Sequence, residues 1–305
     1  MIGSAPEGCD VEFLSHCFSF PQKARTVPCP SCLFSFSHST DTFYLTVKVS
    51  VLGSGSSGNC TYIATEKTCV LVDLGFGPRS LKRRLDQADL QAERIDAVLL
   101  THGHSDHVSG VPGFLARRQV PIFMNEGTRE EVPGLQNIDR WESFRSNSSF
   151  FIGDLQIEAF SVSHDAAEPV GFRFSAQGIC GALVTDLGEF TPSVVENLSG
   201  CDWFIVESNH DEQMLKIGPY PWSIKQRVLS RLGHLSNQEL STFLSNSFDG
   251  QAAHIFLAHL SRRNNDPKIA LDHASRALFQ DLPLYAKCCN LHLTHQSKPS
   301  IVLDL

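Results

Sequence analysis

The sequence lacks several features that define whole classes of protein. It has no uninterrupted apolar run of about 18 residues, so we expect no membrane-spanning helix and no membrane partner. No basic stretch followed by an apolar stretch lies near the N-terminus, so we expect no secretory signal. An excess of positive charge is also missing, because the formal net charge is −8 at pH 7. This charge argues against a protein that coats nucleic acid through bulk positive charge, although bound metal ions would still let an enzyme grip phosphates locally.

A disulfide pattern is missing as well, although the chain contains ten cysteines. Cys60, Cys69, Cys180 and Cys201 lie in or beside apolar stretches, where free cysteine behaves as a small core residue. We therefore expect reduced thiols and a cytoplasmic location.

The remaining composition is that of a globular protein, since 42% of the residues are hydrophobic and 19% are charged. Residues 1–45 stand apart, because proline and serine are scattered through them without a clear hydrophobic period. Cys29 and Cys32 have the C-x-x-C spacing of a redox pair or of half a zinc site, but no second pair accompanies them. We predict a poorly ordered extension or a mis-assigned start over residues 1–45, one folded domain over 46–282, and a tail over 283–305 that is a candidate to complete a sheet.

The most informative stretch reads T-H-G-H-S-D-H and follows an apolar segment, residues 95–100, which we predict to be a buried strand. Three imidazoles and one carboxylate lie close together in this stretch, and both groups bind divalent metals. In an extended turn, His102 and His104 face one point. Asp106 and His107 then face a second point nearby. The stretch therefore predicts a loop that supplies two metal ions; the alternative is a polar, solvated, histidine-rich loop.

This H-x-H-x-D-H pattern resembles the signature of the metallo-β-lactamase superfamily of hydrolases. The resemblance implies three further ligands, each at the end of a strand, and His164, Asp186 and His259 are the candidates because each directly follows an apolar segment. Any one of them alone would more often be an ordinary buried or capping residue, so their order and placement carry the prediction. The resemblance also implies that Asp73 supports the metal loop without binding a metal.

The order of the predicted elements favours an α/β fold, the metallo-β-lactamase αββα sandwich, in which two mixed β-sheets pack face to face with helices outside. Residues 126–147 are polar, and we expect irregular structure there. Strands are predicted over residues 45–52, 60–64, 69–73, 120–124 and 203–206, hairpins over 150–163 and 170–185, and helices over 78–88 and 110–118.

A glycine-rich turn, G-S-G-S-S-G-N, separates the first two predicted strands. Its backbone N–H groups are suited to cradle a phosphate, although a wide hairpin turn is equally consistent with the pattern. The candidate substrate contacts in this turn are Ser54, Ser56, Ser57 and Asn59.

Two histidines outside the ligand set are candidates for proton transfer. His234 comes just before a capping box that begins at Ser236, so it lies beside a helix N-terminus, where backbone donors favour anions. His210 follows an apolar strand. Each histidine could donate a proton to a leaving oxygen or hold a phosphate, and each could instead be a hydrogen-bonded structural residue. Ser236 and Asn237 are candidate substrate contacts beside His234. Arg227, Arg231, Arg262 and Arg263 are candidate contacts for backbone phosphates, or they belong to a solvated face.

A larger set of motifs resembles the YycJ-type (WalJ) branch of this superfamily over residues 47–280. The motifs are L-G-S-G-S-S-G-N, T-H-x-H-x-D-H, T-D-L-G, E-S-N-H-D, G-P-Y-P, G-H-L-S-N and A-H-L-S-x-x-N-N. The resemblance implies that residues 46–282 form a catalytic domain of a bacterial, cytosolic enzyme with 5′→3′ exonuclease activity on DNA.

The resemblance also implies two divalent ions, either zinc or manganese. In the hypothesis that follows from it, one ion is bound by His102, His104 and His164, the other by Asp106, His107 and His259, and Asp186 bridges them. A hydroxide shared by two such ions would attack phosphorus in line, which places Asp106 in the catalytic group as well.

Two other classes of function stay open at this point. One is a metallo-hydrolase of a small ester, thioester, lactone or cyclic phosphodiester, because one fold and one metal site serve many chemistries. The other is a metal-binding regulatory module without turnover. The residues alone do not distinguish DNA from RNA as substrate, and they do not define the oligomeric state.

Overall fold

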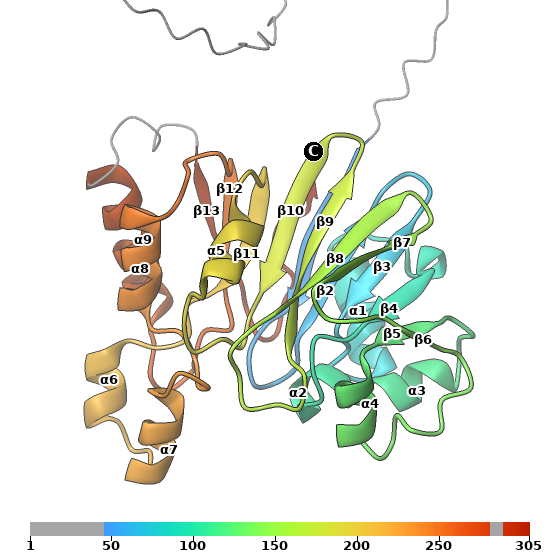
Figure 1. Ribbon diagram of the computed structural model, residues 1–305, viewed down its shortest axis with the longest axis horizontal. Helices are drawn as coiled ribbons and strands as arrows, with labels where there is room; N and C mark the ends of the chain where they lie inside the picture. The colour runs from blue at the N-terminus through green and yellow to red at the C-terminus, as the bar shows by residue number, and fades with distance from the viewer. Residues whose placement is uncertain (1–45, 281–288) are drawn as a thin grey trace, which may run out of the picture. The chain divides into compact units, whose positions relative to one another are not determined.

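The computed structural model describes residues 46–280 and 289–305. The prediction for residues 1–45, including the Cys29 and Cys32 pair, lies outside the described residues. Within the described residues the strands form two sheets of seven strands each, and Figure 1 shows them packed face to face with helices on the outer sides. The predicted αββα sandwich is confirmed.

The first sheet is mixed. Its first strands pair antiparallel, and the strands from β3 (Cys69–Val72) to β6 (Trp141–Ser143) run parallel. The order across the sheet is β14 (Leu303–Asp304), β1 (Lys48–Gly53), β2 (Cys60–Ala64), β3 (Cys69–Val72), β4 (Ala97–Leu99), β5 (Ile122–Met124) and β6 (Trp141–Ser143).

The second sheet repeats this plan. Its strands from β7 (Ser148–Ile152) to β10 (Ile179–Val184) pair antiparallel, and those from β10 to β13 (Asn290–Leu293) run parallel. The order across the sheet is β13 (Asn290–Leu293), β12 (His254–Ala258), β11 (Trp203–Glu207), β10 (Ile179–Val184), β9 (Val170–Ala176), β8 (Leu155–Ser161) and β7 (Ser148–Ile152). The last two strands of the chain, β13 and β14, thus lie at the edge of one sheet each.

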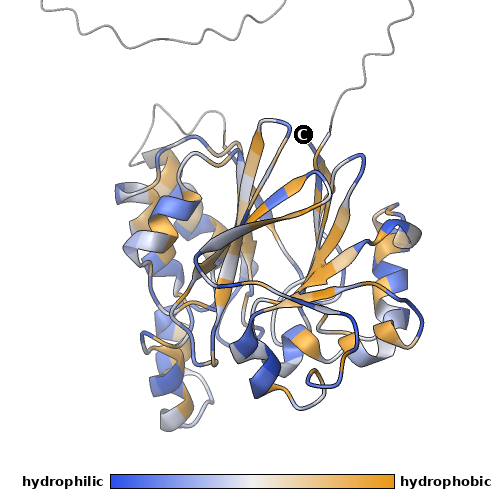
Figure 2. Cartoon of the chain, turned by 45° about the vertical axis from the view of Figure 1, so that its right-hand side comes forward, coloured by the Kyte–Doolittle hydropathy of each residue, from blue (hydrophilic) through white to orange (hydrophobic). Residues whose placement is uncertain are grey.

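The core lies between the sheets. Val51 and Ile63 from the first sheet are buried in one cluster with Phe172, Phe174 and Trp203 from the second. Alternate residues of the same strands point outward, where they are covered by helices, so both faces of the central strands are apolar. Figure 2 shows this as hydrophobic strands inside and helices with hydrophilic outer faces.

The helices are short and cover the outer faces of the two sheets. The first sheet is covered mainly by α1 (Pro78–Gln87) and α3 (Val111–Leu115), and the second by α5 (Pro192–Leu198), α8 (Asn237–Asn246) and α9 (Pro267–Gln280). The others are η1 (Ala92–Arg94), α2 (Ser105–Val108), α4 (Glu126–Glu131), α6 (Glu212–Ile217) and α7 (Trp222–Val228). Among the described residues no helix is long and apolar enough to cross a bilayer.

Most predicted elements are present with slightly shifted ends. The hairpin between β9 and β10 turns at Gln177 and Gly178, whose positive φ angles of 56° and 83° are those of a two-residue hairpin turn. The capping box at Ser236 is also confirmed, because its side chain and that of Glu239 bond each other's backbone N–H groups. The described cysteines are free thiols, and Cys180 is only partly buried.

One prediction of local structure is wrong. Residues 126–147, expected to be irregular, contain α4 and β6. The Asn125 side chain accepts a hydrogen bond from the Thr128 N–H and so starts α4. The strand β6 pairs only with β5 and has two exposed residues of three, so its sequence shows no apolar period.

Candidate metal centre

The centre lies where strands of both sheets end. Parallel strands bring their carboxyl ends to one edge of a sheet, so polar residues that directly follow such strands meet there. Asp73 follows β3, and the histidine-rich stretch follows β4. In the second sheet, His164, Asp186 and His259 follow β8, β10 and β12.

The histidine-rich stretch is a turn that leads into a helix. His104 is the N-cap residue of α2, so His102 and His104 lie in the turn while Asp106 and His107 lie on the short helix. Asp73 holds this arrangement: its carboxylate accepts the Thr101 N–H at 2.9 Å and bonds Nδ1 of His107 at 2.8 Å. The imidazole Nε2 of His107 is thereby directed away from Asp73, which is the positioning role expected for this aspartate.

All seven predicted ligands come together. His164 Nε2 lies 3.3 Å from His104 Nδ1, and His107 Nε2 lies 3.1 Å from Asp186 Oδ2. His259 Nε2 lies 3.6 Å from an oxygen of Asp106. The groups that offer ligand atoms within 4.8 Å of one another are His102, His104 and His164; Asp106, His107 and His259; His102, His107 and Asp186; and Asp186, Glu207, His234 and His259.

The chemistry of this cluster fits divalent metal ions. The Nε2 atoms of His102 and His259 are buried and have no hydrogen-bond partner among the described residues. A buried nitrogen without a partner is costly, and a metal ion in the cluster would satisfy it. Imidazole and carboxylate together suit zinc and manganese.

Hydrogen bonds from behind set the orientation of the imidazoles. His164 Nδ1 donates to the carbonyl oxygen of Gly233 at 3.0 Å, which leaves its Nε2 free for the centre. Asn59 supports the other side, because its amide nitrogen lies 3.3 Å from a carboxylate oxygen of Asp106.

Three residues of the centre have strained backbones. Asp73, Asp186 and His259 have φ angles of 60°, 57° and 54°, in the left-handed region that favours glycine. Such strain persists only where the surroundings impose it, and it is concentrated at functional sites. Each of these residues is therefore held in this conformation by its surroundings at the end of a strand.

Glu207 is a residue of the site that sequence reasoning missed. It ends β11, its side chain is fully buried, and one carboxylate oxygen bonds Nδ1 of both His234 and His259, at 2.9 and 2.8 Å. Its other oxygen accepts the backbone N–H groups of Leu187 and Leu235, at 3.1 and 3.2 Å. Burial alone would raise the pKa of Glu207, but the two imidazoles outweigh it and hold the pKa at about 2. The E-S-N-H-D motif contains this residue, but nothing in the motif reveals its partners.

The two candidate proton donors lie in different environments. Burial lowers the pKa of His234, but the Glu207 carboxylate outweighs burial and the pKa is raised above its usual value. His210 is fully buried, and neither ring nitrogen has a hydrogen-bond partner in the described part of the chain. Burial lowers the pKa of His210 to about 4, so its ring is neutral at pH 7. These environments favour His234 over His210 as a proton donor.

The predicted substrate contacts divide into two kinds. Ser54 is buried and its hydroxyl accepts the His259 N–H at 2.8 Å, and Asn59 is committed to the metal loop, so both support ligands. Ser56 and Ser57 are exposed in the glycine-rich turn and stay candidates for a phosphate.

The remaining two predicted contacts are buried beside α8. The Ser236 side chain caps this helix, and the Asn237 side chain bonds the Ser208 hydroxyl and Asn265. Their polar groups have structural partners, so the structure gives them a supporting position next to His234.

The family follows from the fold, the centre and the sequence together. Residues 68–252, more than half of the chain, match the family described as "Beta-lactamase superfamily domain". The chain belongs to the metallo-β-lactamase superfamily.

Within that superfamily, the chain is similar to proteins named as exodeoxyribonucleases. It is 38% identical over 233 residues to exodeoxyribonuclease YycJ of Bacillus anthracis, a match that covers 75% of this chain and 88% of that protein. It is 36% identical over 229 residues to exodeoxyribonuclease WalJ of Streptococcus pneumoniae, covering 73% and 85%. These matches confirm the resemblance to the YycJ-type branch.

Solved structures share the fold. The metallo-β-lactamase fold protein YhfI from Bacillus subtilis superposes with a TM-score of 0.64 at 16% identity, covering 86% of this chain and all of that protein. A diphosphatase of the PhnP family superposes with a TM-score of 0.57 at 19% identity, covering 86% and 98%.

Proposed function

We propose that this chain is a metal-dependent phosphodiester hydrolase, and specifically a 5′→3′ exonuclease that degrades DNA with two zinc or manganese ions. The observation that carries the proposal is the cluster of seven candidate ligands, five of them buried, with two unpartnered imidazole nitrogens, in a chain similar over most of its length to proteins named as exodeoxyribonucleases. A cytoplasmic location is part of the same proposal.

The ligands divide between two ions. His102, His104 and His164 would hold one, Asp106, His107 and His259 would hold the other, and Asp186 contacts a histidine of each group. When bound, the ions activate water as a nucleophile and neutralise charge that develops on the phosphate. Within the chain, Asp73 and Glu207 bond Nδ1 of His107 and His259, and so keep Nε2 of each ring directed at the cluster.

His234 is suited to protonate the leaving oxygen. Its Nδ1 is bonded to Glu207, which stabilises the charged ring, and the ring remains partly exposed beside Asp186. Ser56 and Ser57 complete the proposed contacts, because both are exposed in a turn whose Asn59 bonds Asp106 of the metal loop.

The experiment is degradation of a DNA duplex labelled at either the 5′ or the 3′ end, with manganese, zinc or a chelator. We expect metal-dependent loss that begins at the 5′ end and disappears in Asp186→Ala. The matched control is Asp139→Ala, which removes an exposed carboxylate and should leave the rate unchanged.

A protein that binds two ions but degrades neither DNA nor RNA with any metal would refute the nuclease proposal. Turnover of small esters by the same preparation would then support the small-molecule hydrolase. If the preparation has neither nuclease nor esterase activity, the result would support the regulatory module. RNA degradation in place of DNA degradation would correct the substrate alone.

A further inference from the structure

The segment from α6 to the turn before α8 differs in charge from the rest of the chain. Residues 213–233 contain four lysine and arginine residues and no aspartate or glutamate, in a chain whose formal net charge is −8. One of these cations is committed internally, because the buried Lys225 ammonium donates to the carbonyl oxygen of Lys216. Two arginines, Arg227 and Arg231, are exposed over 55% and 83% of their side chains.

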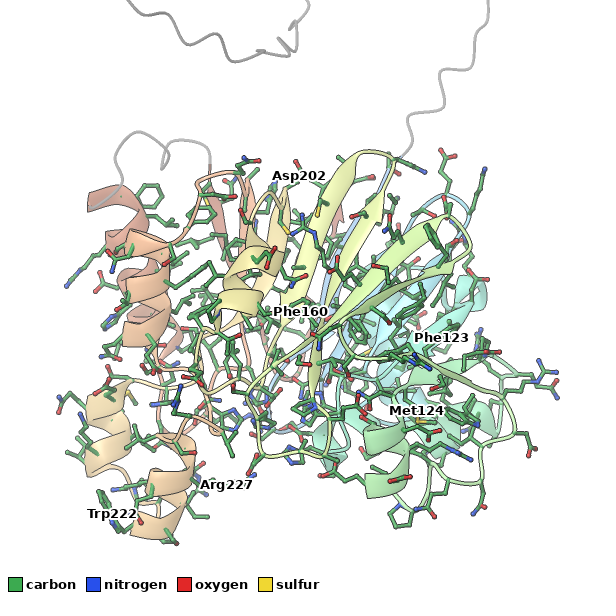
Figure 3. The ribbon with its side chains drawn as sticks, in the orientation of Figure 1. Phe123, Met124, Phe160, Asp202, Trp222 and Arg227 are labelled. Atoms are coloured by element: carbon green, nitrogen blue, oxygen red, sulfur yellow. The ribbon has the colours of Figure 1, made fainter. Side chains whose placement is uncertain are left out.

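Both arginines pair with a carboxylate that lies beside the metal centre. Arg227 Nε donates to Asp165, the residue that directly follows the ligand His164. Arg231 donates through Nε to Glu189 at 2.8 Å, three residues after the ligand Asp186. In Figure 3, Arg227 extends from α7 toward the ends of the strands, whereas Trp222 extends from the other side of the same helix.

The backbone contacts here are tight, so the arginines are held close to the ligand loops. A Cβ atom on Gly188 would lie only 2.2 Å from the carbonyl oxygen of Arg231, and the Gly233 carbonyl oxygen bonds His164. The backbone of this segment is therefore packed against the ligand loops by contacts that do not depend on the ion pairs.

A guanidinium group recognises a phosphate with the same fork of N–H donors that it offers to a carboxylate. Each arginine has five such donors, and the bonds to Asp165 and Glu189 use only part of them. Exposed ion pairs contribute little to stability, because solvent screens them, so the successive phosphates of a nucleic acid strand can compete with each carboxylate for the guanidinium group.

We propose that Arg227 and Arg231 bind backbone phosphates of the nucleic acid strand next to the bond being cleaved, and that Asp165 and Glu189 occupy the two guanidinium groups until a strand arrives. This inference rests on the proposed function, since it names the residues that receive the polyanionic substrate. The opposing possibility is that the two ion pairs only fasten α7 and the turn after it to the ligand loops.

The two possibilities predict opposite effects of the acidic partners, and equilibrium binding separates them. The probe is a short, labelled, single-stranded oligonucleotide with phosphorothioate linkages, which keep the charge and slow hydrolysis. It is titrated with the full-length, metal-loaded protein over a range of salt concentrations, by fluorescence anisotropy.

We expect Arg227→Ala and Arg231→Ala each to weaken binding by roughly threefold to tenfold, and to reduce the slope of log K against log salt by about 0.7. Asp165→Asn and Glu189→Gln should instead strengthen binding at low salt by roughly twofold, because they release the guanidinium groups. The matched control is Arg276→Ala on α9, which removes an exposed arginine paired with Asp272 and should change neither quantity.

Each variant is checked for metal content and unfolding temperature. Asp165 is next to the candidate ligand His164, so Asp165→Asn could change the metal content. In that case Glu189→Gln still tests the effect of removing an acidic partner. Weaker binding by both acidic variants would refute the inference, because an ion pair that only fastens α7 or the turn after it is broken equally by removing the arginine or its acidic partner. An equal loss in Arg276→Ala would also refute it.

The outcome is independent of the degradation assay. Wild-type degradation of DNA without the expected binding pattern overturns this inference and leaves the proposed function standing. The expected binding pattern without degradation overturns the exonuclease proposal and supports the arginines as a polyanion-binding surface.

Discussion

Replacing Glu207 with glutamine tests whether one buried carboxylate supports the metal centre. Its two oxygens have different hydrogen-bond partners. One oxygen accepts hydrogen bonds from the imidazoles of His234 and His259, and the other accepts hydrogen bonds from two backbone N–H groups. A glutamine has one oxygen and one NH₂ group, so in either orientation the NH₂ group faces two donors.

Both orientations carry a cost that follows from these contacts. If the NH₂ group faces the backbone, two buried N–H groups lose their acceptor, at about 1–3 kcal/mol each. If it faces the imidazoles, Nδ1 of His259 must accept and the proton moves to Nε2, the nitrogen assigned to the metal. We therefore expect Glu207→Gln to lower the free energy of unfolding by about 2–4 kcal/mol and to weaken one bound ion by about 10–100-fold.

The assays are chemical denaturation and competition for metal with a chromophoric chelator. His259 belongs to one ligand group and His102, His104 and His164 to the other, so bound metal should fall from two ions toward one per chain. Glu142→Gln, which changes an exposed residue on β6, is the control and should alter neither the denaturation midpoint nor the metal affinity. Wild-type affinity for both ions in Glu207→Gln, with an unchanged denaturation midpoint, would refute the role assigned to this carboxylate.

Two further outcomes follow from the same structure. Burial lowers the pKa of His107, but Asp73 and Asp186 outweigh it and raise the pKa to about 10 in the metal-free protein. An ion must displace that proton, so metal affinity should rise by about tenfold per pH unit through the neutral range, and a pH-independent affinity in chelator competition would contradict this. A Cβ atom on Gly181 would lie 1.9 Å from the Trp203 ring, so Gly181→Ala should destabilise the fold by about 1–3 kcal/mol in thermal unfolding. Gly134→Ala, where a Cβ atom meets nothing within 4 Å, is its control, and equal unfolding temperatures would show that the core relaxes around the added methyl group.

Much of the fold was predictable because the two sheets are built from apolar strands with clear ends. The strand predicted over residues 60–64 is β2, and the helix predicted over 78–88 is α1 with one residue fewer. The ligands were predictable for a related reason: His164, Asp186 and His259 each interrupt an apolar run, and a polar residue at that place has a position in space fixed by its strand. The strand β6 was missed because an exposed edge strand needs no apolar pattern.

The roles of individual polar groups were less predictable. Ser54 and Asn59 were assigned to substrate because of the glycine-rich turn around them, yet both bond the metal loop or a ligand. Ser236 and Asn237 were assigned in the same way, and both have structural partners. A hydroxyl or an amide in a loop has the same sequence signature whether it faces solvent or a neighbouring strand.

The sequence by itself determined the two-sheet sandwich, the strand ends and the types of ligand that the centre contains, because periodicity and residue chemistry are local properties of the chain. Only the tertiary structure decided which polar groups share a bond. Glu207 meets His259 across 52 residues, and Arg227 meets Asp165 across 62. A hydrogen bond depends on distances of about 3 Å and on direction, and between residues so far apart in the chain these are set only when both sheets have packed.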